Sequence, residues 1–255
     1  MTARIGLQLY TLREEAARDM VGVLEFAKEV GFVAVEPAGF GTMSAAAFAA
    51  KLKELDLEAP SAHVPMRPKG EIEPSLEEAA QIGARWAFVS MPKERFISLD
   101  STKRAAEELN AARETASSFG IDLGYHNHWW EFDRSPDGQV PYRVFLAELD
   151  PATPLEVDIY WVRTGGEDPA LLLAELGDRV THLHVKDGPA NTTDPNTAVG
   201  EGVVDIAGAV SATPASWHIV ELDRCSTDMR EAVRKSYQYL VAKKLSEGRR
   251  GAWAS

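Results

Sequence analysis

The chain of 255 residues is poor in cysteine, in long apolar runs and in positive charge. Cys225 is the single cysteine, so no intrachain disulfide can form and a reducing, cytoplasmic compartment is expected. No apolar run approaches the roughly 20 residues that a membrane helix needs. The N-terminus lacks a positively charged segment followed by a long apolar run, which argues against a secretory signal. These absences predict a soluble cytoplasmic protein with no membrane partner.

Positive charge is scarce because 27 Lys and Arg residues face 39 Asp and Glu residues, which gives a formal net charge of −12. A field of this sign repels phosphate backbones and anionic membrane surfaces, so no nucleic-acid partner is expected. The hydrophobic fraction of 45% and the charged fraction of 26% are ordinary for a globular protein. The composition does not argue for or against small neutral substrates.

Strand-like and helix-like segments alternate along the whole chain. The strand-like segments are 4–10, 32–37, 58–64, 86–90, 121–127, 154–160, 180–187 and 217–223. The helix-like segments are 19–31, 44–56, 75–83, 101–119, 142–150, 168–178, 203–212 and 227 to about 246. Ser44 and Asp168 are candidate N-caps, the latter followed by a proline at the first helical position.

Eight strand-then-helix units in a chain of this length predict an α/β fold, a (β/α)₈ TIM barrel with parallel strands inside and helices outside. A doubly wound open sheet is the alternative, but "QLYTLRE" after the first strand is not the Gly-rich turn that such a sheet would favour. No Pro/Gly/Ser-rich linker divides the chain, so one domain over residues 1–255 is expected. The polar segment 187–202 lacks an apolar pattern and is expected to be a mobile surface loop on the active-site face, a candidate to close over a ligand.

Four residues of metal-binding type stand at the ends of the last four predicted strands: His126, Asp158, His184 and Glu221. The carboxyl ends of barrel strands meet on one face, so these side chains should converge. Two imidazoles and two carboxylates suit a divalent ion, with Mn²⁺ first and Mg²⁺, Co²⁺, Fe²⁺ or Zn²⁺ as alternatives. His128 or Glu131 could replace His126 as the fourth ligand. Alternatively, Asp158 could cap the following turn and Glu221 could pair with an arginine.

A divalent ion at this place would polarise the carbonyl of a hydroxy-ketone and stabilise the enediolate that forms when a neighbouring C–H proton leaves. Glu221 and Glu131 are the candidate proton acceptors, and His128 is a third candidate for proton transfer. Candidate substrate contacts on the same face are Glu36, His63, Lys186 and Trp129, where Lys186 could steady an oxyanion and Trp129 could stack on a sugar. Surface salt bridges, capping contacts and core packing are the competing interpretations for these four.

Several segments together resemble a known family: "GLQLYTLRE", "GFVAVEPAGF", "YHNHWWEF", "EVDIYWV", "HLHVKDG", "VGEGVVDI" and "HIVELD". They are similar to the sugar phosphate isomerase/epimerase group of the xylose isomerase-like TIM barrels, which includes inosose dehydratase and the ketose 3-epimerases. The resemblance covers nearly the whole chain. It implies that Asp158, His184 and Glu221 correspond to the family's metal-binding aspartate, histidine and last glutamate, and it suggests a homo-oligomer, either a dimer or a tetramer.

The family's ketose epimerases have a glutamate at the end of the fifth strand, where this chain has His126. This departure argues against simple 3-epimerisation, and the "YHNH" form looks closer to inosose dehydratase, which eliminates water from a keto-polyol. The resemblance therefore implies a divalent-metal-dependent isomerase or epimerase of a small sugar or keto-sugar. The alternative is a lyase that eliminates water or another leaving group from a keto-inositol or 3-keto-sugar. The sugar, its phosphorylation and the metal are left open.

Two functions of other classes are disfavoured. A phosphodiester endonuclease, suggested by the structural cousin endonuclease IV, would need a richer set of metal ligands and a basic groove, whereas this chain has six histidines and a charge of −12. A non-catalytic binding barrel would not need metal-binding residue types at four strand ends.

Overall fold

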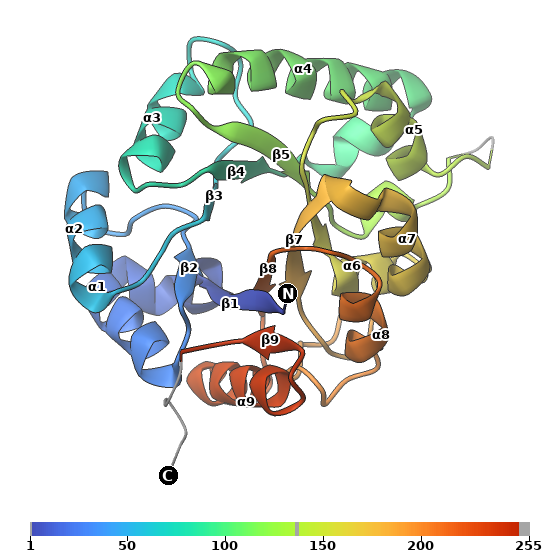
Figure 1. Ribbon diagram of the computed structural model, residues 1–255. Coiled ribbons are helices and arrows are strands. Elements are labelled where there is room, and N and C mark those ends of the chain that lie inside the picture. Colours follow the sequence, from blue (N-terminus) through green and yellow to red (C-terminus); the bar gives the residue numbers. More distant parts are fainter. Residues whose placement is uncertain (1, 136–137, 250–255) are drawn as a thin grey trace.

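The computed structural model describes residues 2–135 and 138–249, and it shows parallel strands around one axis with helices on the outside (Figure 1). The barrel strands are β1 (Ala3–Gln8), β2 (Ala34–Glu36), β3 (Ser61–His63), β4 (Trp86–Val89), β5 (Asp122–His126), β6 (Leu155–Asp158), β7 (Val180–Val185) and β8 (Trp217–Val220). The (β/α)₈ barrel predicted from the sequence is confirmed. The described residues form a single domain.

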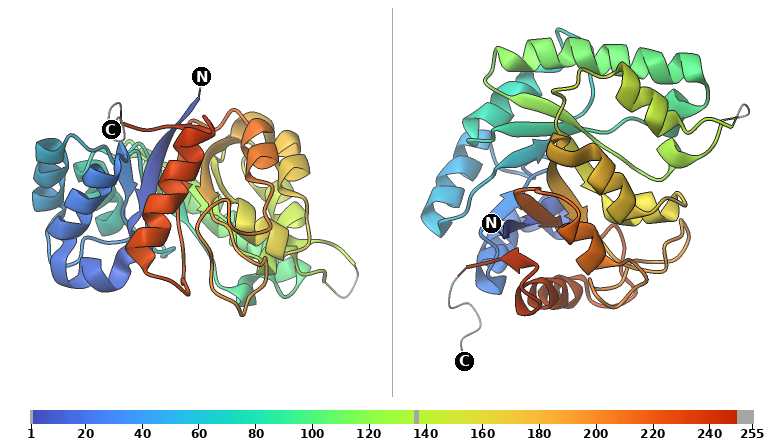
Figure 2. Two further views of the ribbon diagram at one scale, coloured as in Figure 1. Left: turned by 90° about the horizontal axis from the view of Figure 1, so that it is seen from below. Right: turned by 45° about the vertical axis from the view of Figure 1, so that its right-hand side comes forward.

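Helices surround the barrel from every side (Figure 2). They are α1 (Arg13–Val30), α2 (Ala45–Leu55), α3 (Glu73–Gln81), α4 (Leu99–Ser117), α5 (Pro141–Glu148), α6 (Ile159–Thr164), α7 (Pro169–Leu176), α8 (Ile206–Ser211) and α9 (Met229–Ala242). Short 3₁₀ turns are η1 (Leu9–Leu12), η2 (Lys93–Phe96), η3 (Trp130–Phe132) and η4 (Gly177–Arg179). Within the described ranges, no helix combines the length and the apolar character needed to span a membrane.

The sheet follows the order β2-β1-β8-β7-β6-β5-β4-β3, and main-chain hydrogen bonds between β2 and the approach to β3 close the ring. The Val35 amide donates to the Glu58 carbonyl at 2.8 Å, and the His63 amide donates to the Pro37 carbonyl at 2.8 Å. A two-residue strand, β9 (Ser246–Glu247), pairs with the start of β1. The closed ring brings β2 and β3 opposite β6 and β7, which decides the composition of the site.

Helix starts follow the capping residues of the sequence. The Ser44 hydroxyl accepts from the Ala47 amide at 3.2 Å, and the Asp168 carboxylate accepts from the Leu171 amide at 3.0 Å, so both predicted caps are confirmed. The helix expected to begin at 19 is the second half of α1, because Asp19 has non-helical dihedral angles and caps the amide of Gly22 at 2.9 Å.

Strand β6 is shorter than its sequence predicts. The expected strand 154–160 is wrong at its end, because Ile159 and Tyr160 already belong to α6. Asp158 terminates the strand by accepting the Trp161 amide at 2.9 Å, which makes it the N-cap of α6.

The segment 187–202 is a surface loop, as its composition predicts, with exposed residues such as Thr192 and Asp194, but both of its ends are anchored. Its base is the buried carboxylate of Asp187, which accepts main-chain N–H groups of Gly188, Gly200, Gly202 and Val204 at 2.8–3.1 Å. A buried carboxylate needs hydrogen-bond partners, and here the four N–H donors come from both ends of the loop. Asp187 therefore holds both ends of the loop against the barrel.

The barrel interior beneath the site is filled with aromatic and apolar groups. The ring of His182 on β7 lies within 4.9–6.4 Å of the Trp86, Phe88 and Trp217 rings. A Cβ atom at Gly124 would lie 2.3 Å from the Pro154 carbonyl oxygen and 2.7 Å from the Phe88 ring, so only glycine fits there without a shift. This packed layer is the floor on which the polar residues of the site rest.

Candidate functional site

The four predicted metal ligands converge as the strand pattern requires. His126, Asp158 and His184 end or nearly end β5, β6 and β7, and Glu221 directly follows β8. One ligand atom of each lies within 4.8 Å of the others, and all four residues are buried. His184 Nδ1 is 2.7 Å from Glu221 Oε2, and His126 Nε2 is 4.0 Å from Asp158 Oδ2. Because these atoms can approach one cation together, the group is a candidate metal site.

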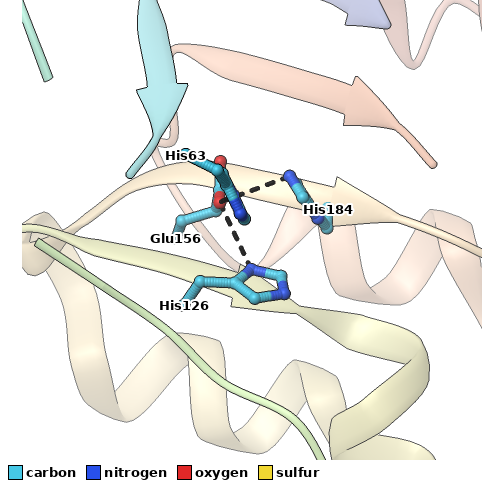
Figure 3. A group of neighbouring side chains, drawn as sticks. All are labelled: His63, His126, Glu156 and His184. Carbon is cyan, nitrogen blue, oxygen red and sulfur yellow. Dashed lines mark hydrogen bonds and ion pairs between the residues drawn. The ribbon is translucent and has the colours of Figure 1, made fainter. Parts of the chain in front are cut away.

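A second group shares two of these residues and adds Glu156 and His63 (Figure 3). Glu156 Oε2 lies 2.6 Å from His63 Nε2, 3.2 Å from His126 Nδ1 and 3.2 Å from His184 Nε2. Figure 3 shows the carboxylate of Glu156 between the three imidazole rings. Sequence reasoning missed Glu156, although a signal was present: it stands two residues before Asp158 and therefore shares its face of the strand.

Glu36, predicted to contact substrate, is fully buried against this group. His184 Nε2 is 2.8 Å from Glu36 Oε1, the Gln8 amide donates to the same oxygen at 2.7 Å, and the Ser61 hydroxyl donates to the other oxygen. Burial alone would raise the pKa of Glu36, but the neighbouring His63 and His184 hold it below its usual range. Glu36 is thus placed to orient imidazoles.

Nearby carboxylates favour the protonated forms of the His63 and His184 imidazoles. Burial alone would lower the pKa of His63, but the charges of Glu156 and Glu36 raise it above the ordinary value. Burial opposes protonation of His184 in the same way, yet Glu156 and Glu221 raise its pKa well above the ordinary value. The pKa of Glu156 is raised, chiefly by burial and by the charge of Glu36. The cluster therefore attracts positive charge, either protons or a metal ion.

Lys186 is also buried, and its ammonium group contacts three carboxylates. The Nζ atom lies 2.9 Å from Asp158 Oδ2, 2.6 Å from Glu221 Oε2 and 3.0 Å from Asp223 Oδ2. Burial alone would lower the pKa of Lys186, but these carboxylates raise it well above the ordinary value. Lys186 is therefore a fixed positive charge beside two of the predicted ligands, and Asp223 is a further partner that the sequence did not single out.

The motif "YHNHWWEF" divides between the site and the turn that supports it. Glu131 accepts from the Tyr125 hydroxyl at 2.7 Å and from the His128 amide at 3.0 Å, and burial is the main reason that its pKa rises to about 8. Asn127 accepts the Asp158 amide at 3.1 Å and so ties this turn to β6. Glu131 thereby fixes the loop that carries His128.

His128 and Trp129 point to different surroundings. The His128 ring stacks on Trp130 with centroids 4.2 Å apart, and burial lowers its pKa to about 3. The Trp129 ring faces the Lys93 ammonium group at 4.5 Å, and Trp129 is not among the described residues that line the cavity over the cluster. The structure therefore brings His128 to the site, but does not bring Trp129 there.

A cavity of about 490 Å³ opens above the cluster. The described residues that line it are Tyr10, Ala38, Gly39, His63, Val64, Pro65, Ser90, His126, His128, Lys186, Glu221 and Asp223. Glu131 and Trp129 are not among them. The volume suits a small ligand, which would meet imidazoles and carboxylates at the cavity floor.

The sequence model of the xylose isomerase-like TIM barrel family matches residues 24–240. No curated protein matches the chain. Because the family match covers most of the chain, family membership does not depend on the likeness of fold alone.

Solved structures with the same fold are similar over nearly their whole length. A sugar phosphate isomerase/epimerase from Parabacteroides distasonis ATCC 8503 is 24% identical with a TM-score of 0.79, over 97% of this chain and 96% of that one. An L-ribulose 3-epimerase is 16% identical with a TM-score of 0.72, over 95% and 94%. The IOLI protein, described with a binding zinc atom, is 14% identical with a TM-score of 0.73, over 94% and 97%. At these identities the likeness shows the fold, and together with the family match it establishes that the chain belongs to the xylose isomerase-like TIM barrel family.

Proposed function

We propose that the protein is a divalent-metal-dependent isomerase or epimerase of a small sugar or keto-sugar. One observation carries the proposal: two imidazoles and two carboxylates from four neighbouring strands, all buried, offer ligand atoms within 4.8 Å of one another beneath a cavity. The names of the sugar phosphate isomerase/epimerase and the L-ribulose 3-epimerase with the same fold agree with this choice.

The residues fit a divalent ion by their chemistry and by their surroundings. Asp158 Oδ2 is a buried oxygen without a hydrogen bond, although the ammonium group of Lys186 is its charged neighbour. His126, Asp158, His184 and Glu221 would hold the ion, for which we propose Mn²⁺ before Mg²⁺, Co²⁺, Fe²⁺ or Zn²⁺. When bound, such an ion polarises a carbonyl group and stabilises negative charge on its oxygen.

Glu221 is the proposed proton acceptor because it reaches the cavity wall and is held ionised. Burial alone would raise its pKa, but Lys186 and His184 hold the pKa well below its usual range. A carboxylate in this state can accept a proton from a carbon next to a carbonyl group. His128 lines the same cavity as a neutral imidazole, since burial lowers its pKa to about 3, and it is a second proposed site of proton transfer.

A lyase reaction on a keto-inositol or 3-keto-sugar is the second candidate, favoured by the position of Glu131. Epimerisation through two carboxylates would need both at the substrate, yet Glu131 is fully buried between Tyr125 and the His128 amide. The carboxylates at the cavity wall are instead Glu221 and Asp223, which both contact the ammonium group of Lys186, and His63 and His128 line the same cavity. Carboxylates gathered at one ammonium group, with imidazoles nearby, suit removal of a proton and protonation of a departing hydroxyl.

The first prediction concerns exchange of substrate protons with deuterated water. With added Mn²⁺, the protein should exchange a C–H proton next to the carbonyl of at least one member of a panel of ketoses and keto-inositols, as measured by proton NMR. Removal of metal, or Asp158→Asn, should reduce the exchange rate by about 100-fold or more. Formation of an unsaturated product would assign the lyase reaction.

The matched control is Asp178→Asn, which changes an exposed carboxylate in η4, before the start of β7 and thus at the opposite end of that strand from His184. This substitution should leave the exchange rate unchanged. Full exchange activity in metal-stripped protein would contradict the proposed function.

A further inference from the structure

Two imidazole rings of the site each stand between two sets of carboxylates. His126 directs Nε2 toward Asp158 Oδ2 at 4.0 Å and Nδ1 toward Glu156 Oε2 at 3.2 Å. His184 directs Nδ1 toward Glu221 Oε2 at 2.7 Å and Nε2 toward Glu156 Oε2 at 3.2 Å. Each ring therefore presents one nitrogen to Asp158 or Glu221 and the other nitrogen to Glu156.

This arrangement defines two adjoining cation positions. The Asp158 position consists of His126, Asp158, His184 and Glu221, and the Glu156 position consists of His63, His126, Glu156 and His184. The first offers two nitrogen and two oxygen atoms, and the second offers three nitrogen atoms and one oxygen atom. Both are compatible with divalent transition metals, which accept imidazole and carboxylate ligands.

The shared rings favour occupation of one position at a time. An imidazole can bind two ions only if both of its nitrogens are deprotonated, and here two rings would have to do so together. With an ion at the Asp158 position, the remaining N–H groups would donate to Glu156 and Glu36. With an ion at the Glu156 position, they would donate to Asp158 and Glu221. The carboxylates of the empty position can thus accept hydrogen bonds from the imidazoles that bind the ion and so orient them. Ligating histidines commonly have such partners.

Lys186 distinguishes the two positions by charge. Its ammonium group contacts Asp158 Oδ2 at 2.9 Å and Glu221 Oε2 at 2.6 Å, which are oxygens that an ion at the Asp158 position would need. In the described part of the chain, the ion-pair partners of Glu156 are imidazoles alone, which lose their protons when a metal binds. Lys186 therefore competes with an ion at the first position and leaves the second free.

We propose that the cluster offers a divalent ion two alternative positions that share His126 and His184, and that Lys186 shifts the ion from the Asp158 position toward the Glu156 position. The inference rests on the metal site of the proposed function, but it adds a position with His63 and Glu156 as ligands. A substrate that draws Lys186 away from Asp158 and Glu221 would move the ion back toward the Asp158 position.

Metal binding to single and double variants tests this proposal without reference to activity. Purified protein would be titrated with Co²⁺ and Mn²⁺, and the bound ions counted after removal of free metal. The wild type, Asp158→Asn and Glu156→Gln should each bind one ion, with Kd changed by about 10- to 100-fold in the single variants. The double variant Asp158→Asn/Glu156→Gln should bind none.

The visible spectrum of bound Co²⁺ should distinguish the positions. Asp158→Asn should give the spectrum of the nitrogen-rich set, Glu156→Gln that of the mixed set, and Lys186→Met should shift the wild-type spectrum toward the latter. If Glu156→Gln does not fold, His63→Gln replaces it, because His63 belongs only to the Glu156 position. Asp178→Asn is the control and should match the wild type.

Three results would overturn the proposal. These are loss of the ion in Asp158→Asn alone, simultaneous binding of two ions by the wild type, and identical Co²⁺ spectra in the two single variants. The first result would leave the proposed function standing, since the ion would then occupy the Asp158 position only. Absence of any bound ion in the wild type would contradict both proposals.

Discussion

Asp158 illustrates how one side chain serves two purposes in this barrel. Its Oδ1 atom caps α6 by accepting the Trp161 amide at 2.9 Å, while Oδ2 faces Lys186 at 2.9 Å and His126 at 4.0 Å. Capping and metal binding, which compete as interpretations of the sequence, are therefore compatible in the structure. Burial is the main reason that the pKa of Asp158 rises to about 6, and Lys186 opposes that rise.

Glu131 allows a prediction about pH and stability at the same scale. Its pKa is raised from 4.5 to about 8 in the folded protein, so between these values the folded state keeps a proton that the unfolded state has released. The free energy of unfolding should therefore fall as pH rises from about 5 to 8, by an amount on the order of a few kcal/mol from this group. Glu131→Gln, which resembles the protonated form, should flatten this dependence.

Urea unfolding of the wild type and Glu131→Gln at several pH values measures the effect. The difference between the two free energies of unfolding should change in favour of the glutamine variant as pH rises. Parallel curves over the whole range would show that Glu131 is already ionised in the folded protein. Asp133→Asn, an exposed carboxylate of the same turn, is the matched control and should follow the wild type.

At the scale of elements, the loop after β7 depends on one carboxylate. Asp187 accepts four main-chain amides, two on each oxygen, and is almost completely buried. Because β7 carries His184 and ends directly before Lys186, a loop fixed at Asp187 also limits how far this strand end can move. The polar composition of 187–202 does not predict this anchoring, because a carboxylate that accepts main-chain N–H groups leaves no apolar pattern in the sequence.

We predict that Asp187→Asn destabilises the protein by about 3 kcal/mol, because the amide nitrogen would face two N–H donors and leave them buried without an acceptor. The free energy of unfolding from urea titration measures this change. Asp194→Asn, which alters an exposed residue of the same loop, should cost less than about 0.5 kcal/mol. Equal effects of the two substitutions would contradict the role given to Asp187.

At the scale of the whole molecule, the two ends of the ring of helices are joined by charge pairs. Arg230 of α9 lies 2.7 Å from Glu15 of α1, and Arg234 lies 2.8 Å from Glu29. These contacts place the first and last helices side by side, as Figure 1 shows. Some basic residues are thus paired with carboxylates inside the fold, and acidic residues remain in excess over the whole chain, with a formal net charge of −12.

The net charge of −12 predicts that the protein does not bind DNA. A gel-shift assay at low salt, with duplex DNA and with duplex DNA that contains an abasic site, should show no retarded band at micromolar protein. A retarded band that disappears as salt is raised would contradict this prediction and would favour a nuclease-like function.

The order of strands and helices was determined by the sequence alone, since buried strands leave continuous apolar runs and helix ends carry capping residues such as Ser44 and Asp168. The convergence of Asp158, His184 and Glu221 followed as well, because parallel strands end on one face of a barrel. Boundaries such as the end of β6 were less well predicted, since Ile159 and Tyr160 are as apolar as the strand before them. The two residues of β9 are too few to leave any pattern.

Only the tertiary structure decided which side chains of the site contact one another. Glu36 and His184 lie 148 positions apart in the chain and meet at 2.8 Å because the barrel closes between β2 and β3. The same closure places His63 against Glu156. The barrel interior also brings Lys186 against Asp158 and Glu221. The low dielectric constant there strengthens charge–charge interactions, so the protonation state of each group depends on its neighbours. A sequence specifies which side chains reach the strand ends, whereas the curvature and closure of the sheet determine which of them touch.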